Sequence, residues 1–360
     1  MTVKPIQGLK IPKIGKQQLS LLEKLSNAHA VSGDEHEVRN IVKQEITAAA
    51  ARIKTDAMGN LLVTRPSTSP QALKVMVAAH MDEIGLMITK NENGGFYRFA
   101  AVGGIDPRQL PGKRVCIGKD HWPGVIGIKP IHLQKRKERE SVPEIEDLFI
   151  DAGDADKINP GERVSFATSF QPMGKSLMGK ALDNRLGVMI LMELIKNAPS
   201  TIELQAAFTV QEEIGLRGAK VAAHYFNPDL ALVIDSTPAM DLPVWDHTEN
   251  ATYNTQLGKG AALYLADSGT VSDPRLVAHL EKTAHAYHIP YQFRQPGGGK
   301  TDAASIHLTH SGIPSVTISV PGRYAHTAAM ICRLQDIQSV FGLIFSALHT
   351  MPIDILKVAR

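Results

Sequence analysis

The chain has 360 residues, of which 43% are hydrophobic and 21% are charged, and its formal net charge is +3 at pH 7. This length exceeds that of a usual single core, so we expect two structural units, one of them inserted in the other. The small net charge, the dispersed lysines and arginines, and the lack of any apolar run near ~18 residues argue against a nucleic-acid partner and against a membrane partner.

Only two cysteines occur, Cys116 and Cys332, and neither belongs to a Cys-x-x-Cys motif. This usage argues against a disulfide scaffold and against a zinc site built from thiolates, and it fits a reducing compartment. The first residues contain no apolar stretch of the kind found in a signal peptide. We therefore expect a cytoplasmic protein.

The first part of the chain predicts two helices and two strands. Leucines at helical spacing indicate a helix over residues 17–30. Ser32 and Glu35 form a capping-box pattern, which predicts that a second helix covers residues 35–53. Its apolar face would consist of Val38, Ile41, Val42 and Ile46. Short apolar runs then predict strands over residues 61–64 and 75–79.

A change of pattern between about residues 88 and 175 indicates an insertion. Short strand-like pieces are separated there by glycine and proline, without a helix of ordinary length, which predicts a small β-barrel or sandwich. The basic run at 134–140 is interspersed with acids, so we expect a solvated loop. We assign residues 1–88 and 175–360 to a catalytic α/β domain and 89–174 to an inserted β-barrel that serves dimerisation.

Helix and strand patterns alternate again after residue 175. Helices are predicted over 184–198, 215–226 and 272–288 and from Gln335 onward, and strands are predicted over 202–210 and 229–235. This spacing is typical of βαβ units. The expected fold class is α/β, with a mixed, mostly parallel sheet flanked by helices.

Five short polar clusters follow apolar strand-like runs, and they contain the ligands of a two-metal site. The clusters are 80–83, 183–185, 211–213, 235–236 and 324–326. Side chains beyond the carboxyl ends of neighbouring parallel strands converge in one crevice. A single cluster of this kind is ordinarily a turn or a helix cap, but five of them together are not explained in that way.

Such a ligand set supports hydrolysis. Two divalent ions about 3.5 to 4 Å apart can share a hydroxide and polarise a carbonyl group. Imidazole and carboxylate ligands suit zinc, cobalt or manganese. Glu212 and Glu213 are adjacent, so on an extended segment one would bind metal while the other faces the water as a general base. Asp82 lies two residues after His80 and could accept the ring N–H of that histidine.

The motifs AAHMDEIG, GKALDNR, QEEIGLRGA, VIDS and RYAHT resemble family 42 of the metallopeptidases, the aminopeptidases that include glutamyl aminopeptidase and the TET peptidases. The resemblance extends over nearly the whole chain. It implies two divalent ions per subunit, with zinc favoured and cobalt or manganese as alternatives. It further implies that dimers, joined by the barrel, assemble into a hollow tetrahedral dodecamer with the active sites facing inward.

The resemblance also implies a role for each motif residue. His80 and Asp235 would bind one ion, Glu213 and His326 the other, and Asp183 would bridge the two. Glu212 would be the general base, and Asp82 would support His80. Substrate binding would fall to Lys300, Thr301 and Asp302, although Lys300 stands where relatives usually carry glycine. The segment 327–330 lacks the glutamate that relatives commonly have after the last histidine.

The expected function is therefore that of a metal-dependent aminopeptidase that removes N-terminal residues from peptides through a hydroxide bridging the two ions. A deacylase of N-acyl amino acids is an alternative, because the same two-ion site can cleave any exposed amide. A third hypothesis, from a different functional class, is a non-catalytic scaffold whose site binds metal only for structure. Retention of Glu212 beside Glu213 argues against it, since a structural site needs no base.

Overall fold

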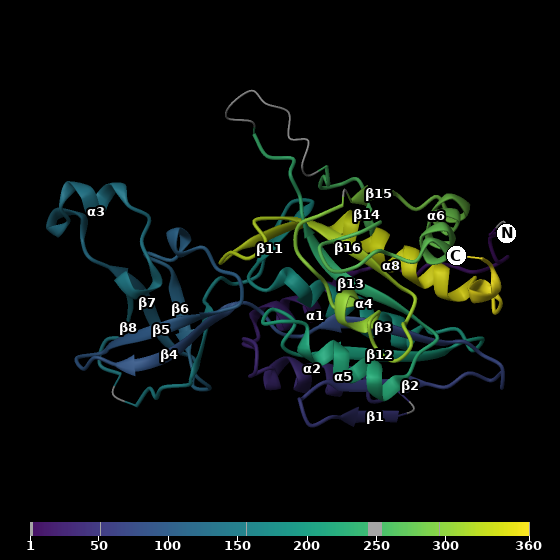
Figure 1. Ribbon diagram of the computed structural model, residues 1–360, viewed down its shortest axis with the longest axis horizontal. Coiled ribbons are helices and arrows are strands. Elements are labelled where there is room, and N and C mark those ends of the chain that lie inside the picture. Colours follow the sequence, from purple (N-terminus) through teal and green to yellow (C-terminus); the bar gives the residue numbers. More distant parts are fainter. Residues whose placement is uncertain (1–2, 51, 156, 244–253, 295, 360) are drawn as a thin grey trace.

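An eleven-stranded sheet forms the centre of the molecule, and a closed barrel of six strands lies beside it (Figure 1). The computed structural model describes residues 3–50, 52–155, 157–243, 254–294 and 296–359. Both chain termini lie at the end of the molecule away from the barrel (Figure 1). The predicted α/β fold with an additional barrel is confirmed.

The order of strands in the large sheet brings four parallel strands to its centre. The order is β1 (Arg52–Thr55), β2 (Leu61–Arg65), β12 (Glu203–Thr209), β3 (Lys74–His80), β13 (Leu230–Pro238), β16 (Ser315–Arg323), β17 (Met330–Arg333), β11 (Ser176–Gly179) and β10 (Gln171–Met173). A side branch, β14 (Ala261–Tyr264) and β15 (Tyr291–Arg294), pairs with β16 through β14. Strands β12, β3, β13 and β16 run parallel. Their carboxyl ends therefore meet along one edge of the sheet.

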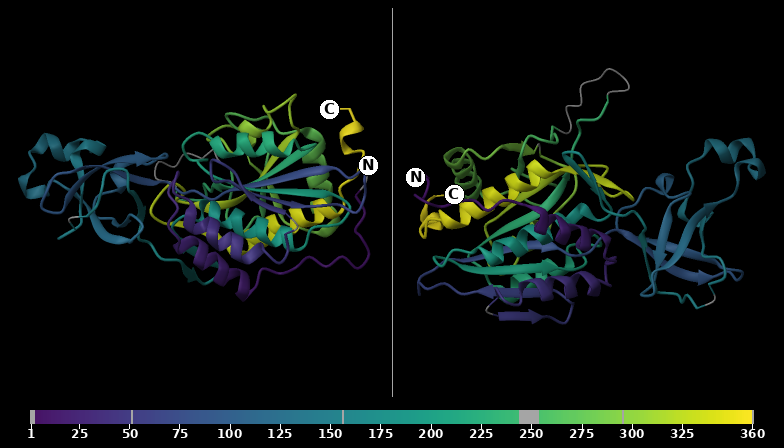
Figure 2. Two further views of the ribbon diagram at one scale, coloured as in Figure 1. Left: turned by 90° about the horizontal axis from the view of Figure 1, so that it is seen from below. Right: turned by 180° about the vertical axis from the view of Figure 1, so that it is seen from behind.

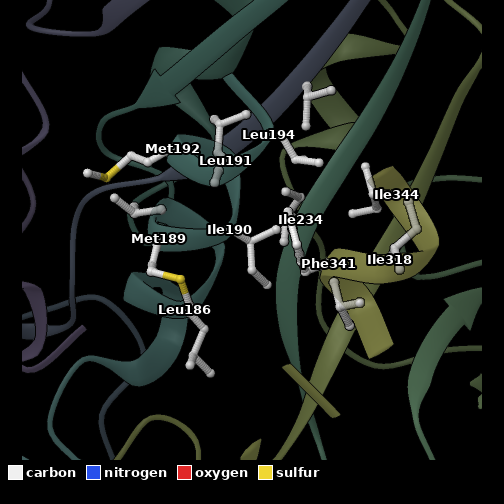
Figure 3. Packing of buried hydrophobic residues seen from close by; sticks show 14 of the residues in the cluster. Leu186, Met189, Ile190, Leu191, Met192, Leu194, Ile234, Ile318, Phe341 and Ile344 are labelled. Carbon is white, nitrogen blue, oxygen red and sulfur yellow. The ribbon is translucent and has the colours of Figure 1, made fainter. Parts of the chain in front are cut away.

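Helices cover both faces of this sheet (Figure 2). One core contains side chains of α1 (Lys16–Asn27), α2 (His36–Ile46), α4 (Leu182–Lys196), α6 (Pro274–Tyr287) and α8 (Leu334–His349). The opposite core contains those of α5 (Arg217–Phe226) and α7 (Ala303–Ile306). Successive residues of β3 alternate between the cores, with Val75 and Val77 in the first and Met76 and Ala78 in the second. Figure 3 shows the first core, where Ile190 and Leu194 of α4 lie near Ile234 of β13 and Phe341 of α8.

The inserted barrel has a hydrophobic core of its own. Its strands follow the order β4 (Gly85–Asn91), β5 (Phe96–Val102), β8 (Leu148–Asp151), β7 (Trp122–Ile128), β6 (Arg114–Ile117) and β9 (Arg163–Phe166). The basic run contains the short exposed helix α3 (Arg136–Glu140), where we expected only a loop. Short 3-10 turns complete the chain: η1 (Pro107–Gln109), η2 (Ile131–Leu133), η3 (Ile145–Asp147) and η4 (Ile355–Lys357). The division at residues 88 and 175 stays a prediction.

Two local predictions near the N-terminus are wrong. Helix α2 ends at Ile46 and not at Ile53, because Arg52 to Thr55 instead pair antiparallel with β2 as an edge strand. The Ser32 hydroxyl does not cap α2, which begins at His36. It donates instead to Asp82 Oδ2 over 2.6 Å. The serine thus supports the candidate site and not the helix.

Two composition-based expectations concern cysteines and membrane spans. Cys116 and Cys332 are both free thiols. Among the described residues, the helices are all too short or too polar to cross a bilayer.

Candidate metal centre

Strand ends and tight turns place the predicted ligands at one edge of the sheet. His80 is the last residue of β3, and Asp235 lies near the end of β13. Glu212 and Glu213 follow β12 on a loop and not on an extended strand, since Gln211 has a left-handed φ of 56°. This turn lets both carboxylates approach the same histidine, within 4.8 Å of a ring nitrogen.

Left-handed backbone also shapes the other two ligand segments. Ala181, with φ of 53°, precedes α4, and Asp183 keeps a non-helical backbone inside its first turn. Tyr324 and His326 have φ of 64° and 57° on the loop after β16. Non-glycine residues in this region cost free energy and cluster at functional sites. The left-handed turns therefore indicate a functional site, in which the position of the side chains outweighs the free-energy cost of the backbone conformation.

Asp183 lies between the two histidines and offers one carboxylate oxygen to each. Its Oδ1 is 3.4 Å from His80 Nε2, and its Oδ2 is 3.7 Å from His326 Nε2. Asp235 Oδ1 lies 3.6 Å from His80 Nε2, and Glu213 Oε2 lies 3.5 Å from His326 Nε2. The five predicted ligands thus form two half-sites that share Asp183.

These separations fit a pair of metal ions better than they fit hydrogen bonds. They exceed the usual N–H···O distance of about 2.9 Å, and the buried Asp183 Oδ1 has no hydrogen-bond partner among the described residues. Two ligand atoms that each lie about 2 Å from one tetrahedral ion are roughly 3.4 Å apart. The groups that could hold an ion are His80 with Asp183 and Asp235, Asp183 with Glu213 and His326, and His80 with Glu212 and Glu213.

The electrostatics of the cluster show why a cation would stabilise it. Burial lowers the pKa of His80, but Glu212, Asp183 and Asp235 outweigh burial and raise this pKa well above its usual value. Burial raises the pKa of Glu213 to about 8, with a further contribution from Asp183. Burial also raises the pKa of Glu212 well above that of an ordinary glutamate. Crowded buried carboxylates of this kind are stabilised in their charged form by a nearby cation.

Asp82 faces both His80 and the glutamate loop. The ring Nδ1 of His80 lies 3.2 Å from the backbone oxygen of Asp82 and 3.5 Å from its carboxylate, so the carbonyl is the closer acceptor. The carboxylate also accepts the backbone N–H groups of Glu212, at 3.0 Å, and Glu213, at 3.1 Å. Asp82 therefore contacts the His80 ring through its backbone oxygen and its carboxylate, and it holds the glutamate loop through its carboxylate.

A buried ion cluster, which sequence reasoning missed, joins two of the ligand segments. Lys180 Nζ donates to both oxygens of Glu83, at 2.8 and 3.0 Å, and Arg185 Nη2 donates to Glu83 Oε1 at 3.1 Å. Arg185 Nε also donates to the backbone oxygen of Met81. The sequence signal was present, because Lys180 and Arg185 flank Asp183 and Glu83 follows Asp82. The cluster holds the loop after β3 against the start of α4.

A pocket of about 550 Å³, including its open mouth, adjoins the proposed metal ligands His80, Asp183 and His326. Lys300 is exposed and lines this pocket, as does Thr301, whose hydroxyl forms a 2.8 Å hydrogen bond with that of Thr317. Asp302 does not line the pocket. It is 1% exposed and accepts a 2.5 Å hydrogen bond from Thr209, and its role in substrate binding stays a prediction.

Two further pocket residues, Tyr264 and Arg294, were absent from the sequence-based set. The guanidinium of Arg294 lies 4.3 Å from the ring centroid of Tyr264 and donates to the backbone oxygens of Gly297 and Gly298. Both residues come from the short side-branch strands β14 and β15. No motif marks them in the sequence.

Comparisons with known proteins agree with this fold. The family model of the M42 glutamyl aminopeptidases matches residues 59–343. The chain is 33% identical over 358 residues to glutamyl aminopeptidase of Lactococcus lactis subsp. cremoris, and the match covers 92% of this chain and 97% of the relative.

Solved structures give the same result. An aminopeptidase from the archaeon Desulfurococcus kamchatkensis matches with a TM-score of 0.89 and 33% identity, covering 95% of this chain and 97% of the other. The TET1 peptidase of Pyrococcus horikoshii, which can assemble into a tetrahedron or a large octahedral shell, matches with a TM-score of 0.80 and 32% identity, covering 91% of this chain and 98% of the other. The fold and the relatives are those of a peptide-bond hydrolase, and the chain belongs to the M42 aminopeptidase family.

Proposed function

We propose that this aminopeptidase uses two divalent ions, held by five side chains, to remove N-terminal residues from peptides. His80 and Asp235 would hold one ion, Glu213 and His326 the other, and Asp183 both. The observation that carries the proposal is the position of Asp183, which offers one carboxylate oxygen to each histidine. A bound ion pair would supply a Lewis acid for the scissile carbonyl and lower the pKa of water. Zinc is the favoured metal, with cobalt or manganese as alternatives.

The chain's own side chains supply the proton transfers and the fixed geometry. Glu212 is 9% exposed and lines the pocket, and its backbone is held by Asp82. Its carboxylate would take a proton from the attacking water and return a proton to the leaving amine.

The experiment that tests the proposal combines metal analysis with a choice of substrates. Exhaustive dialysis against a chelator should remove two ions per chain and abolish release of amino acids from unblocked aminoacyl-anilides, and added zinc, cobalt or manganese should restore it. Acetylated anilides serve as the matched control for the deacylase alternative, which none of the comparisons favours. Full activity after complete metal removal, or preferential cleavage of the acetylated series, would contradict the proposal.

We also propose that the barrel joins subunits into dimers and that the dimers form a tetrahedral dodecamer. Support comes from the shells of the Pyrococcus horikoshii relative and from exposed apolar side chains in the insertion: Phe96, Trp122, Val125, Ile131, Leu133 and Val142. Exposed apolar groups of this kind often mark protein interfaces. Light scattering of wild type and of Ile131→Asp tests this, and a monomeric wild type would contradict it.

A further inference from the structure

The two half-sites differ in which part of the molecule supports them. His80 bonds to the Asp82 carbonyl, and Asp235 accepts the N–H of Ser236 at 2.7 Å, so the first half-site is supported from within the sheet unit. His326, in contrast, is in contact with the loop that joins β5 to β6 of the inserted barrel. This barrel loop comprises residues 103–113 and includes the short turn η1.

Two hydrogen bonds connect the barrel loop to His326. The ring Nδ1 of His326 lies 3.1 Å from the backbone oxygen of Gly104, which can accept its proton. The side-chain amide of Gln109 donates to the backbone oxygen of His326 over 2.8 Å. When Nδ1 carries the proton, Nε2 presents its lone pair toward Asp183 and Glu213. The Gly104 carbonyl therefore selects the tautomer that a metal ligand requires.

Packing around the barrel loop reinforces these hydrogen bonds. A Cβ atom at Gly103 would lie 3.4 Å from the Cβ of Glu213. Glu213 and His326 therefore both adjoin the barrel loop. Ala328, two residues after His326, is 6% exposed and belongs to the hydrophobic core of the barrel. The ligand segment and the barrel are thus packed together at Ala328, just beyond His326.

His326 depends on this support more than His80 does. Its side chain is 47% exposed, against 3% for His80, and its backbone is left-handed. The segment 327–330 also lacks an acidic residue that could bond to the ring. With little burial and an unfavourable φ, the orientation of the ring rests on the Gly104 carbonyl and on the fixed backbone around it.

We propose that the barrel loop completes the second half-site, with Gly104 and Gln109 as positioning residues for His326. The inference rests on the proposed two-metal function and extends it. The inserted barrel would then set the affinity for the second ion, and a displacement of the barrel relative to the sheet would weaken that ion without disturbing the first. Neither residue is among those that line the pocket, so both would act through His326.

The test measures the two metal-binding steps separately in the full-length chain. Calorimetric titration of the metal-free protein with zinc, together with metal analysis after dialysis, should give two steps in wild type. Gly104→Ala places a methyl group 3.2 Å from His326 Nδ1, which forces the ring to shift. The second step should weaken by about 10- to 100-fold, as for other outer supports of metal ligands. Gln109→Ala should weaken it by about 2- to 10-fold, the worth of one hydrogen bond.

Gln134→Ala is the matched control. Its side chain makes a similar amide-to-backbone bond, to the oxygen of Lys129, in the same insertion but on an exposed segment away from the site. Both binding steps should be unchanged in this variant. If only the second metal-binding step weakens in the two loop variants, the loop positions His326. A general structural defect would instead weaken both steps.

Three outcomes are decisive. An unchanged second step in both Gly104→Ala and Gln109→Ala would overturn the inference while leaving the two-metal proposal intact. Equal weakening of both steps would overturn it as well. A wild-type chain that binds no second ion would instead contradict the proposed function. If Gly104→Ala fails to fold, Gln109→Ala still decides the question, because its smaller change leaves the loop backbone intact.

Discussion

The carboxylate Oδ1 of Asp82 accepts the backbone N–H of Glu212 over 3.0 Å, and both residues are buried. Asp82, two residues after the histidine at the end of β3, thus fixes the backbone of the loop that carries the proposed base. Such a bond holds the Glu212 carboxylate near its working position before substrate arrives. Removal of the Glu212 charge alone should therefore test its chemistry without moving the loop.

Glu212→Gln should keep both ions but reduce turnover by about 10² to 10⁴, the range typical of general acid–base catalysis. The physical reason is that an amide has nearly the same shape as a carboxylate but cannot take a proton from water. Metal analysis and kcat on an aminoacyl-anilide are the measurements. A variant with more than half of wild-type turnover would remove Glu212 from the mechanism.

Asp183→Ala should cost both ions together, because this carboxylate faces both histidines. His80→Ala and His326→Ala should each weaken mainly one ion, since each ring lies in one half-site with Asp183. The three variants serve as controls for one another in metal analysis after dialysis. Single-ion losses of equal size in all three would contradict the bridging role.

Lys300→Gly should reduce any preference for substrates with an acidic N-terminal residue by a few-fold. Lys300 lines the pocket but remains exposed, and a partly screened ion pair contributes about 0.2 to 1 kcal/mol. The ratio of kcat/KM for glutamyl and leucyl substrates, in wild type and variant, is the measurement. If the ratio does not change, the ammonium group lies in solvent and has no part in specificity.

Acid should destabilise the contact between the barrel and the sheet unit through His29. Burial, assisted by the nearby Lys180 charge, lowers the pKa of His29 to about 4. Because the unfolded value is 6.5, the unfolded chain binds this proton first, and the stability that neutral His29 provides is complete above pH 6.5. It is then lost progressively as the pH falls toward about 4.

Urea unfolding at about pH 7.5 and about pH 5 tests the role of His29. The ring of His29 stacks on that of His121, whose Nε2 bonds to Glu37, and its own Nδ1 contacts Ser165, so other charged groups also contribute to the pH dependence. His29→Gln should therefore reduce the loss of stability between the two pH values but not remove it. His132→Gln, which changes an exposed histidine of the barrel, is the control. Identical losses in wild type and His29→Gln would exclude His29 as a cause.

The sequence predicts those parts of the fold that depend on a local pattern of apolar and polar residues. The apolar runs of β3, β12 and β13 are continuous because both faces of a parallel strand are buried, so they stand out without tertiary information. The polar residues at their ends are then visible as a group. The convergence of His80 and His326 follows from strand topology, which the alternating pattern also indicates, whereas Asp183 reaches them from the first turn of α4.

The parts that could not be predicted depend on partners far away in the sequence. β14 and β15 are four residues long, and they bring Tyr264 and Arg294 to the pocket only by pairing beside β16. Ser32 looks like a helix cap in isolation, and only the position of Asp82 gives its hydroxyl another acceptor. Local patterns contain no information about such competing partners.

Because the proposed ligands extend from residue 80 to residue 326, the metal centre cannot exist until most of the chain has been synthesised. A nascent chain that ends before His326 would have the barrel and most of the parallel sheet but one incomplete half-site. Contacts between residues so far apart in sequence form late and slowly during folding. Activity would therefore appear only as the last step of maturation, so that a growing or truncated chain is kept from cutting its neighbours.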